Sequence, residues 1–123
     1  EKVKKRNTKI LIIKLLGNFF YMEIANRLIE LNRLHFKKTI RKFLLKYMTS
    51  RWGSCHAPSG TISISSRLLL APTEVMDYVL IHELAHLVHM NHSKHFWAEV
   101  SRAMPNYKVH EKWLRDNDYN ADF

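Results

Sequence analysis

The chain is poor in cysteine, glycine and proline, and each shortage excludes a class of protein. Cys55 is the only cysteine among 123 residues, so no internal disulfide can form. A chain without disulfides favours a reducing compartment, and a cytoplasmic location is expected. Three glycines and three prolines are too few for a collagen-like, low-complexity or disordered chain. We therefore expect one ordered domain over residues 1–123, with 46% hydrophobic residues available for its core.

The sequence also lacks a hydrophobic run long enough to cross a membrane. The longest apolar stretch near the start, 10–22, is interrupted by Lys14, Gly17 and Asn18. It is shorter than the ~20 residues that a membrane span needs. It has no small-residue cleavage site of the kind that ends a signal peptide. No membrane partner is therefore expected, and the oligomeric state is left open.

Acidic residues are also scarce relative to basic ones. Eleven Asp and Glu face twenty Lys and Arg, which gives a formal net charge of +9. Such a charge favours polyanions such as nucleic acid or nucleotides, although a solvated basic surface gives the same count. The first nine residues form a basic run that predicts a tail or the frayed start of a helix. Six further basic side chains are candidates for binding nucleotide phosphates: Lys37, Lys38, Arg41, Lys42, Lys46 and Arg51.

Hydrophobic spacing predicts helical and extended segments in the first half of the chain. Residues 10–36 carry apolar side chains at helical spacing, and we expect one or two helices broken near Gly17. Residues 38–48 predict a strand, and residues 61–65 alternate strictly, as a half-buried strand does. With turns expected at Gly53 and at 58–60, the two strands are predicted to form a hairpin.

The second half of the chain predicts three helices. Pro72 precedes a segment that is apolar on almost every side, which predicts a buried helix running to about Met90. Asn91 is expected to end it in a left-handed conformation, and Ser93 to cap the next helix. A last short helix is expected over 108–115.

Four strongly polar residues interrupt the apolar helix before Met90. They are His82, Glu83, His86 and His89, and the first three belong to the segment His82-Glu-Leu-Ala-His86, which is the HExxH pattern. Residues four apart share a helix face, so His82 and His86 can bind one zinc ion at about 2.0–2.1 Å. Glu83 lies about 100° around the helix, beside the metal and free to accept a proton from the attacking water. The pattern therefore predicts a zinc-dependent hydrolase with Glu83 as its catalytic residue.

The third ligand has several candidates. His89 shares the face of His82 but lies about 10 Å along the axis of a straight helix, too far for the same metal. His92 follows the expected turn at the spacing of the last histidine in HExxHxxGxxH, and we predict that it binds the metal. Glu99 and His95 remain alternatives. Three histidines without cysteine leave an open position for water, as in catalytic zinc sites.

Stabilisation of a negatively charged oxygen requires another side chain. The chemically able candidates are Arg51, Tyr107, His95 and His110, of which Arg51 and Tyr107 are the preferred oxyanion or substrate contacts. Cys55 has two interpretations. It is either a redox-sensitive thiol near the metal or, as we favour, a small buried residue at a turn.

Two more segments flank these motifs: Ser50-Arg-Trp-Gly-Ser-Cys55 and Asn91-His-Ser-Lys-His-Phe-Trp97. Together with Leu70-Ala-Pro72 and the HExxH segment, they resemble the YgjP-like metallopeptidase-domain family, relatives of the SprT-like proteases. The resemblance covers about 48–114. It implies an α+β, zincin-like fold: a small twisted β-sheet packed on an active-site helix, with N- and C-terminal helices.

The same resemblance implies that His82, His86 and His92 bind the metal and that Glu83 is the catalytic acid. It further implies that an extended substrate adds beside the strand 61–65 by backbone pairing. The chain departs from the family at Ser65, where Asn is common. It also departs in lacking the β-rich stretch that many members carry before the RWGSC segment.

Three functions remain open from the sequence. The first is a zinc metallopeptidase acting on a peptide or protein, which the HExxH pattern favours. The second is a zinc-dependent nucleotide phosphoanhydride hydrolase of the nucleoside triphosphate pyrophosphatase type, which the positive charge favours. The third is a basic, nucleic-acid-associated protein with structural zinc, which the lack of cysteine ligands disfavours.

Overall fold

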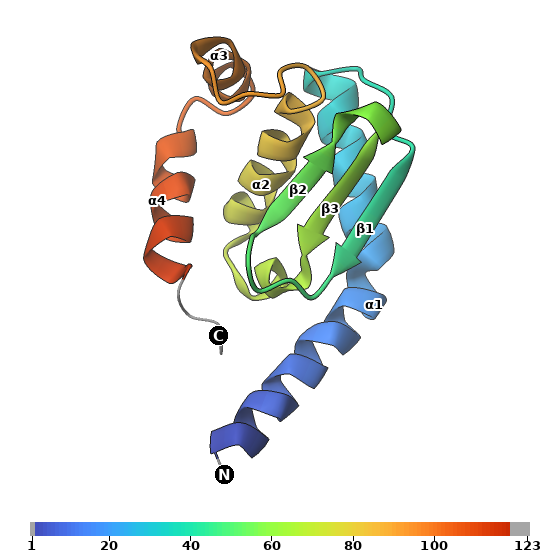
Figure 1. Ribbon diagram of the computed structural model, residues 1–123, viewed down its shortest axis with the longest axis vertical. Helices are drawn as coiled ribbons and strands as arrows, with labels where there is room; N and C mark the ends of the chain where they lie inside the picture. The colour runs from blue at the N-terminus through green and yellow to red at the C-terminus, as the bar shows by residue number, and fades with distance from the viewer. Residues whose placement is uncertain (1, 119–123) are drawn as a thin grey trace.

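A three-stranded sheet with two helices behind it forms the centre of the molecule (Figure 1). The computed structural model describes residues 2–118. The helices are α1 (Lys2–His35), α2 (Thr73–Ala85), α3 (Lys94–Ala103) and α4 (Tyr107–Asn117), and the strands are β1 (Lys42–Lys46), β2 (Gly53–His56) and β3 (Thr61–Ser65). Two short 3-10 helices, η1 (Ala57–Ser59) and η2 (Ser66–Leu70), flank β3. The predicted α+β class, a small sheet packed on a central helix, is confirmed.

The central strand of the sheet is β3. It pairs with β1 in parallel and with β2 in antiparallel orientation, in the order β1-β3-β2. The strand predicted over 61–65 is confirmed, but the half-buried pattern is wrong. Ser63 and Ser65 are buried as well as Ile62 and Ile64, because β3 is the central strand. The expected hairpin between 38–48 and 61–65 is wrong. The chain returns through β2, which begins at the supposed turn residue Gly53, and β3 therefore runs in the same direction as β1.

Helix α1 is continuous, and the break predicted near Gly17 is wrong. Gly17 allows a close approach to η2, because a Cβ added there would lie 3.3 Å from the Cβ of Ser66, a tight contact. The basic run belongs to the exposed first turns of the same helix from Lys2 onward. In Figure 1 this half of α1 extends beyond the edge of the sheet. Across residues 2–118, no helix combines the length and hydrophobicity that a membrane span needs.

Helix α2 is the buried helix that the apolar pattern predicted. It packs against the sheet, α1, α3 and α4, and nine of its thirteen residues are buried. It ends at Ala85, not near Met90. The N–H groups of His86 and Leu87 bond to carbonyls three residues back, at 3.2 and 3.0 Å, and this tightening ends the α-helix.

The segment after α2 differs from expectation in one further respect. Asn91 does not adopt a left-handed conformation, because Lys37 is the only non-glycine residue with positive φ within 2–118. Ser93 caps α3 as predicted, accepting a hydrogen bond from the N–H of Phe96 at 3.4 Å. The chain between Ala85 and Ser93 is therefore a short loop that turns back over the end of α2.

A buried arginine holds the segment that leads into β2. The side chain of Arg67 is 0% exposed and lies over the ring of Trp52, with its guanidinium carbon 4.0 Å from the ring centroid. Its Nε–H donates to the Met48 carbonyl at 2.6 Å, and Nη2 donates to the carbonyls of Thr49 and Arg51 at 3.4 Å. Arg67 thus supplies the donors for a loop that has no sheet partner.

We expect Arg67→Met to lower the free energy of unfolding by about 2–4 kcal/mol, because it leaves partly buried carbonyls without donors. Arg115→Met is a matched control. Arg115 is exposed, and its ion pair with Glu111 is a long surface pair at 3.9 Å. That variant should change stability by less than about 0.5 kcal/mol. Urea denaturation followed by circular dichroism measures both. Equal effects of the two substitutions would contradict this role for Arg67.

Candidate metal centre and active site

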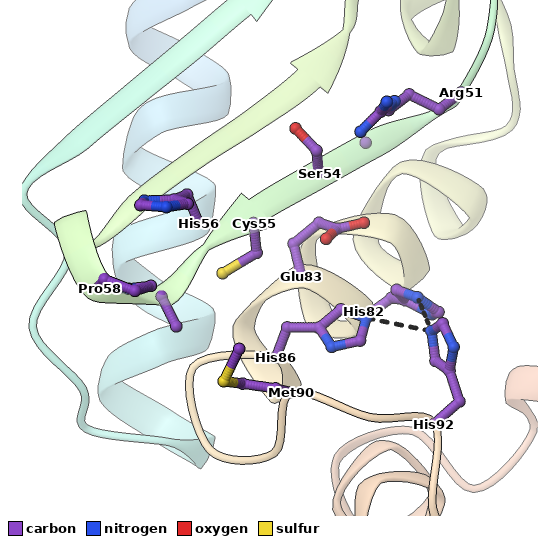
Figure 2. A pocket seen from close by; sticks show the side chains of 12 residues that line it. Arg51, Ser54, Cys55, His56, Pro58, His82, Glu83, His86, Met90 and His92 are labelled. Carbon is purple, nitrogen blue, oxygen red and sulfur yellow. Dashed lines mark hydrogen bonds between the residues drawn. The ribbon is translucent and has the colours of Figure 1, made fainter.

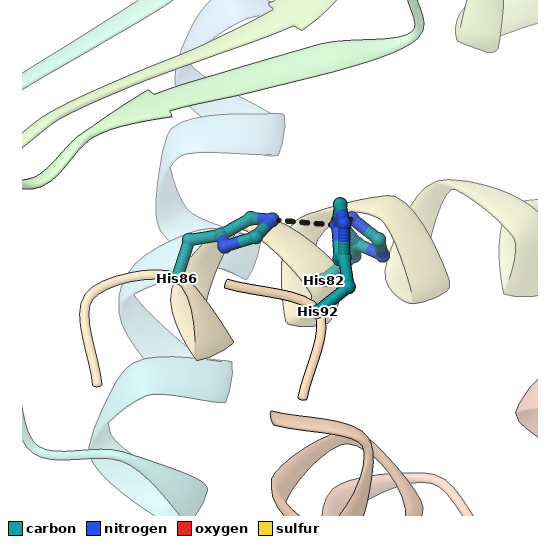
Figure 3. Close-up of side chains that lie close together, drawn as sticks. All are labelled: His82, His86 and His92. Carbon is teal, nitrogen blue, oxygen red and sulfur yellow. Dashed lines mark hydrogen bonds between the residues drawn. The ribbon is translucent and has the colours of Figure 1, made fainter. Parts of the chain in front are cut away.

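Three histidine side chains converge at the end of α2 (Figure 3). His82 and His86 come from α2 and its C-cap, and His92 from the loop that turns back over it. Nε2 of His92 lies 3.1 Å from Nε2 of His86 and 3.3 Å from Nε2 of His82. Within residues 2–118, this is the only group of three or more potential ligand side chains with all ligand atoms within 4.8 Å.

These distances fit a metal ion. Nitrogen ligands at about 2.0–2.1 Å in tetrahedral geometry are separated by about 3.3–3.4 Å. The two measured separations, 3.1 and 3.3 Å, are close to this value. Three imidazole nitrogens suit a divalent transition metal and leave a fourth position for another ligand.

Hydrogen bonds to the other ring nitrogens direct Nε2 towards this centre. Nδ1 of His86 lies 3.1 Å from the carbonyl of His89 and must donate to it, so Nε2 of the neutral ring carries the lone pair. Nδ1 of His82 lies 3.3 Å from the hydroxyl of Tyr78. Tyr78 was missed at the sequence level, although its position four residues before His82 on one helix was a usable signal.

We expect Tyr78→Phe to weaken metal binding by about 10-fold, because the His82 ring loses the partner that orients it. The control is Tyr107→Phe. The Tyr107 ring stacks on Tyr78 and Trp97, and these contacts survive loss of the hydroxyl. Competition with a chromophoric chelator measures the affinity of each variant. If Tyr78→Phe bound metal as tightly as the unaltered chain, the hydroxyl would have no role in orienting His82.

Aromatic rings form the wall behind the histidines. Phe96, which is fully buried, has its ring centroid 4.4–5.0 Å from the centroids of His82, His86 and His92. Burial, and secondarily the two neighbouring histidines, lowers the pKa of His82 to about 3. His82 is therefore neutral at physiological pH, the state that a metal ligand requires.

Glu83 lies beside the histidines, between α2 and β2 (Figure 2). Its side chain is 5% exposed, and burial raises the pKa of its carboxyl to about 8, although the positive charge of Arg51 opposes the shift. Gly53 permits this arrangement. A Cβ at Gly53 would lie 2.9 Å from the Oε2 atom of Glu83, so a larger residue would displace the carboxylate or the strand.

Two cavities meet at these side chains. The first, about 410 Å³, lies between β2 and the three histidines and extends to Met90. The second, about 370 Å³, lies towards α3 and α4 and is lined by Trp52, Tyr78 and Trp97, with the carboxylate-bearing Glu111 in its wall. Arg51, Gly53, His82, Glu83 and His92 line both. His82, His92 and Glu83 are thus open to a ligand from two sides, and His86 from the first cavity only.

The other sequence candidates lie elsewhere. Glu99 forms an ion pair with Arg102 at 2.6 Å, and Arg102 also donates to the carbonyl of His35, so Glu99 faces the end of α1. The rings of His89 and His95 are neighbours of each other, 5.9 Å apart, outside the histidine group. Tyr107 belongs to neither set of cavity-lining residues, whereas Arg51 belongs to both. His110, on α4, is also absent from both sets.

Cys55 differs from the favoured interpretation. It lies within β2, not at a turn, and its side chain is half-buried and directed into the first cavity (Figure 2). Burial and the nearby Glu83 raise the pKa of its thiol to about 11. The thiol is therefore protonated at neutral pH and a poor nucleophile.

The three-histidine group beside a buried carboxylate fits a metal-dependent hydrolase, and the comparisons with known proteins indicate the class of metallopeptidases. The crystal structure of the metallopeptidase zymogen abylysin from Pyrococcus abyssi is similar, with a TM-score of 0.67, 26% identity, and coverage of 76% of this chain and 93% of that chain. The metallopeptidase zymogen jannalysin from Methanocaldococcus jannaschii has a similar fold, with a TM-score of 0.61, 21% identity, and coverage of 75% and 91%. No curated protein gives a significant match.

The chain belongs to the YgjP-like family. The model of the YgjP-like metallopeptidase domain matches residues 2–117. The resemblance seen in the motifs is confirmed, and the match extends well before residue 48 to include α1 and β1.

Proposed function

We propose that the chain is a zinc metallopeptidase in which Glu83 activates the water that attacks the scissile peptide bond. The observation that carries the proposal is the convergence of three Nε2 atoms beside a buried carboxylate, at the junction of two cavities. Zinc bound by His82, His86 and His92 would polarise the substrate carbonyl and lower the pKa of water towards ~7. The lining side chains then determine how protons move and where the peptide lies.

Glu83 is suited to accept and return one proton. Burial makes its charged form less favourable, so the carboxylate has a higher proton affinity than an exposed one. A metal cation held by the neighbouring histidines would favour the ionised form, which is the form that can accept a proton. It accepts a proton from water as the oxygen attacks the carbonyl carbon. It then donates that proton to the departing amine nitrogen when the carbon–nitrogen bond breaks.

Arg51 is the better of the two predicted contacts to the substrate carbonyl. Arg51 lines both cavities and is close enough to Glu83 to affect its carboxyl, which supports a role for its positive charge near the proposed reacting centre. Such a charge stabilises the negative oxygen that develops during attack. Tyr107 instead packs between Trp97 and Tyr78 and supports the wall of the site.

The substrate strand is expected to add beside β2, not beside the strand 61–65. Both edges of β3 are already paired, which rules out the earlier expectation. Ser65, at its end, is fully buried and bonded to the backbone of Met48. β2 is an edge strand that lines the first cavity, so a peptide can pair with it there.

The register of β2 identifies the groups that would pair with a peptide. Ser65 N–H bonds to the Trp52 carbonyl at 2.9 Å. In an antiparallel ladder the bonding pairs alternate, so Ser54 and His56 also bond towards β3. The N–H and C=O groups of Gly53 and Cys55 therefore point away from β3, towards the outer edge. Two residues of substrate backbone can be held at this edge.

The placement of the basic residues favours a peptide over a nucleotide. Of the six side chains considered for phosphate binding, Arg51 alone lines the two cavities. Lys42 and Lys46 lie on β1, which is separated from β2 by β3. A nucleotide at the histidines would thus meet one arginine and not a cluster of positive charge.

The test is to load the chain with zinc and assay it against an unfolded protein such as casein and against nucleoside triphosphates. We expect cleavage of the protein, loss of that activity on adding a chelator, and recovery on adding zinc. Turnover of nucleoside triphosphates without cleavage of protein would contradict the proposal. So would a salt-sensitive affinity for nucleic acid as the only measurable property, because that result indicates a binding protein.

A further inference from the structure

Helix α1 has two apolar faces, and only one of them is packed. Ile13, Gly17, Leu28 and Leu31 are buried against the rest of the molecule. The opposite face carries large apolar side chains that are half to four-fifths exposed: Ile12 50%, Leu15 56%, Phe19 81%, Met22 65% and Ile29 59%. Five large exposed apolar residues that follow one another along one helix face indicate an interaction surface.

The spacing of these residues indicates what kind of partner fits. The steps from Ile12 to Leu15, Phe19 and Met22 are three, four and three residues, and Asn26 and Ile29 continue them by four and three. This is the a and d spacing of a coiled-coil heptad, which keeps one narrow stripe facing a second helix. We refer to Ile12, Leu15, Phe19, Met22, Asn26 and Ile29 as the α1 seam. The α1 seam predicts a helical partner.

We propose that this partner is α1 of a second copy of the chain, and that the two helices pair in antiparallel orientation about a twofold axis near Gly17. In this register Leu15 packs against the partner's Phe19, and Ile12 against the partner's Met22. The same pairs recur on the other side of the axis. From Ile12 to Met22 the seam is thus complementary to itself, as a twofold interface requires. Asn26 and Ile29 lie beyond this central part, opposite the partner's Thr8 and the partner's Lys5.

The charges beside the seam distinguish the two possible orientations. Lys9 and Glu23 occupy equivalent heptad positions on one side of the seam, the e positions, and both are exposed. In an antiparallel pair, e positions face each other, and Lys9 faces the partner's Glu23 twice in the dimer. In a parallel pair, Lys9 instead faces the partner's Lys4. The charge pattern therefore favours the antiparallel arrangement.

The rest of the molecule is compatible with this pairing. The helices and strands that pack on α1 lie on the side opposite to the seam. In the dimer the rest of each subunit would therefore lie outside the two paired helices. None of the seam residues lines the two cavities at the histidines. The dimer would thus leave both active sites open, and its formation is independent of the proposed peptidase activity.

The first test measures the mass of the full chain in solution by sedimentation equilibrium. We expect a species of twice 14.7 kDa for the unaltered chain. Leu15→Glu with Phe19→Glu should give a monomer, with an unchanged circular dichroism spectrum because both side chains are exposed. Val109→Glu is the matched control, an equally exposed apolar residue on α4, and should remain dimeric. A monomeric unaltered chain, or a dimer that survives the seam substitutions, would overturn the proposal.

The second test concerns orientation. Lys9→Glu and Glu23→Lys should each weaken the dimer, by roughly 3- to 10-fold in Kd, and the double variant should restore the original Kd. Asn26→Cys in a Cys55→Ser background should not form a disulfide between subunits, because the two Asn26 positions are far apart in the antiparallel register. Rapid disulfide formation at that position would show a parallel pair and would overturn the proposed arrangement.

Discussion

Replacing Glu83 with glutamine is expected to reduce the rate of peptide hydrolysis by about 10²–10⁴-fold. The amide has nearly the shape of the carboxyl group but cannot accept a proton from water. Glu83 lies beside the three histidines and is not one of the group that converges on the metal centre, so metal binding should be retained. The expected result is therefore an inactive protein with its full complement of zinc.

The measurement pairs single-turnover kinetics on a peptide substrate with determination of bound zinc by mass spectrometry. Glu74→Gln is the matched control, because Glu74 lies on the same helix but is exposed in its first turn. That variant should retain the activity of the unaltered chain. Full activity of Glu83→Gln with zinc bound would rule out Glu83 as the group that accepts the proton.

Replacing His92 with alanine is expected to weaken zinc binding by at least about 100-fold and to abolish hydrolysis. Changes to groups that merely orient a ligand already cost about 10–100-fold, so the loss of a ligand should cost more. His92 is exposed and lies in the loop between Ala85 and Ser93, so its removal should not unfold the domain. Loss of metal and preservation of the circular dichroism spectrum are expected together.

Two variants separate His92 from its rivals. His89→Ala keeps the carbonyl that accepts the hydrogen bond from His86, and Glu99→Ala removes the carboxylate that pairs with Arg102. Both should bind zinc as the unaltered chain does in a chelator competition assay. If Glu99→Ala lost the metal and His92→Ala kept it, the third ligand would be the carboxylate on α3.

The sequence was informative where local geometry decides the outcome. The alternation in residues 61–65 predicted β3, and the cap at Ser93 predicted the start of α3. The sequence was misleading at Gly53, where a turn was predicted, and at Gly17, where a break in the helix was predicted. Each instead allows a close approach, to Glu83 and to Ser66, and such approaches between distant segments have no local signal.

The exclusion of His89 shows how a sound expectation can rest on the wrong cause. Its distance along a straight helix was the argument from sequence. The α-helix in fact ends at Ala85, and the His89 carbonyl turns back to accept a hydrogen bond from His86. The end of a buried helix depends on what packs over it, and the spacing of apolar residues does not record that.

By itself, the sequence determined which helix carries His82, Glu83 and His86 and how these three are spaced around it, because the pitch of an α-helix is fixed by the backbone. The tertiary structure alone decided that Nε2 of His92 comes within 3.3 Å of Nε2 of His82 and of His86, and that β2 lies at an edge of the sheet. These features join segments distant in the chain or depend on how strands are ordered. They follow from packing in three dimensions, which no local pattern encodes.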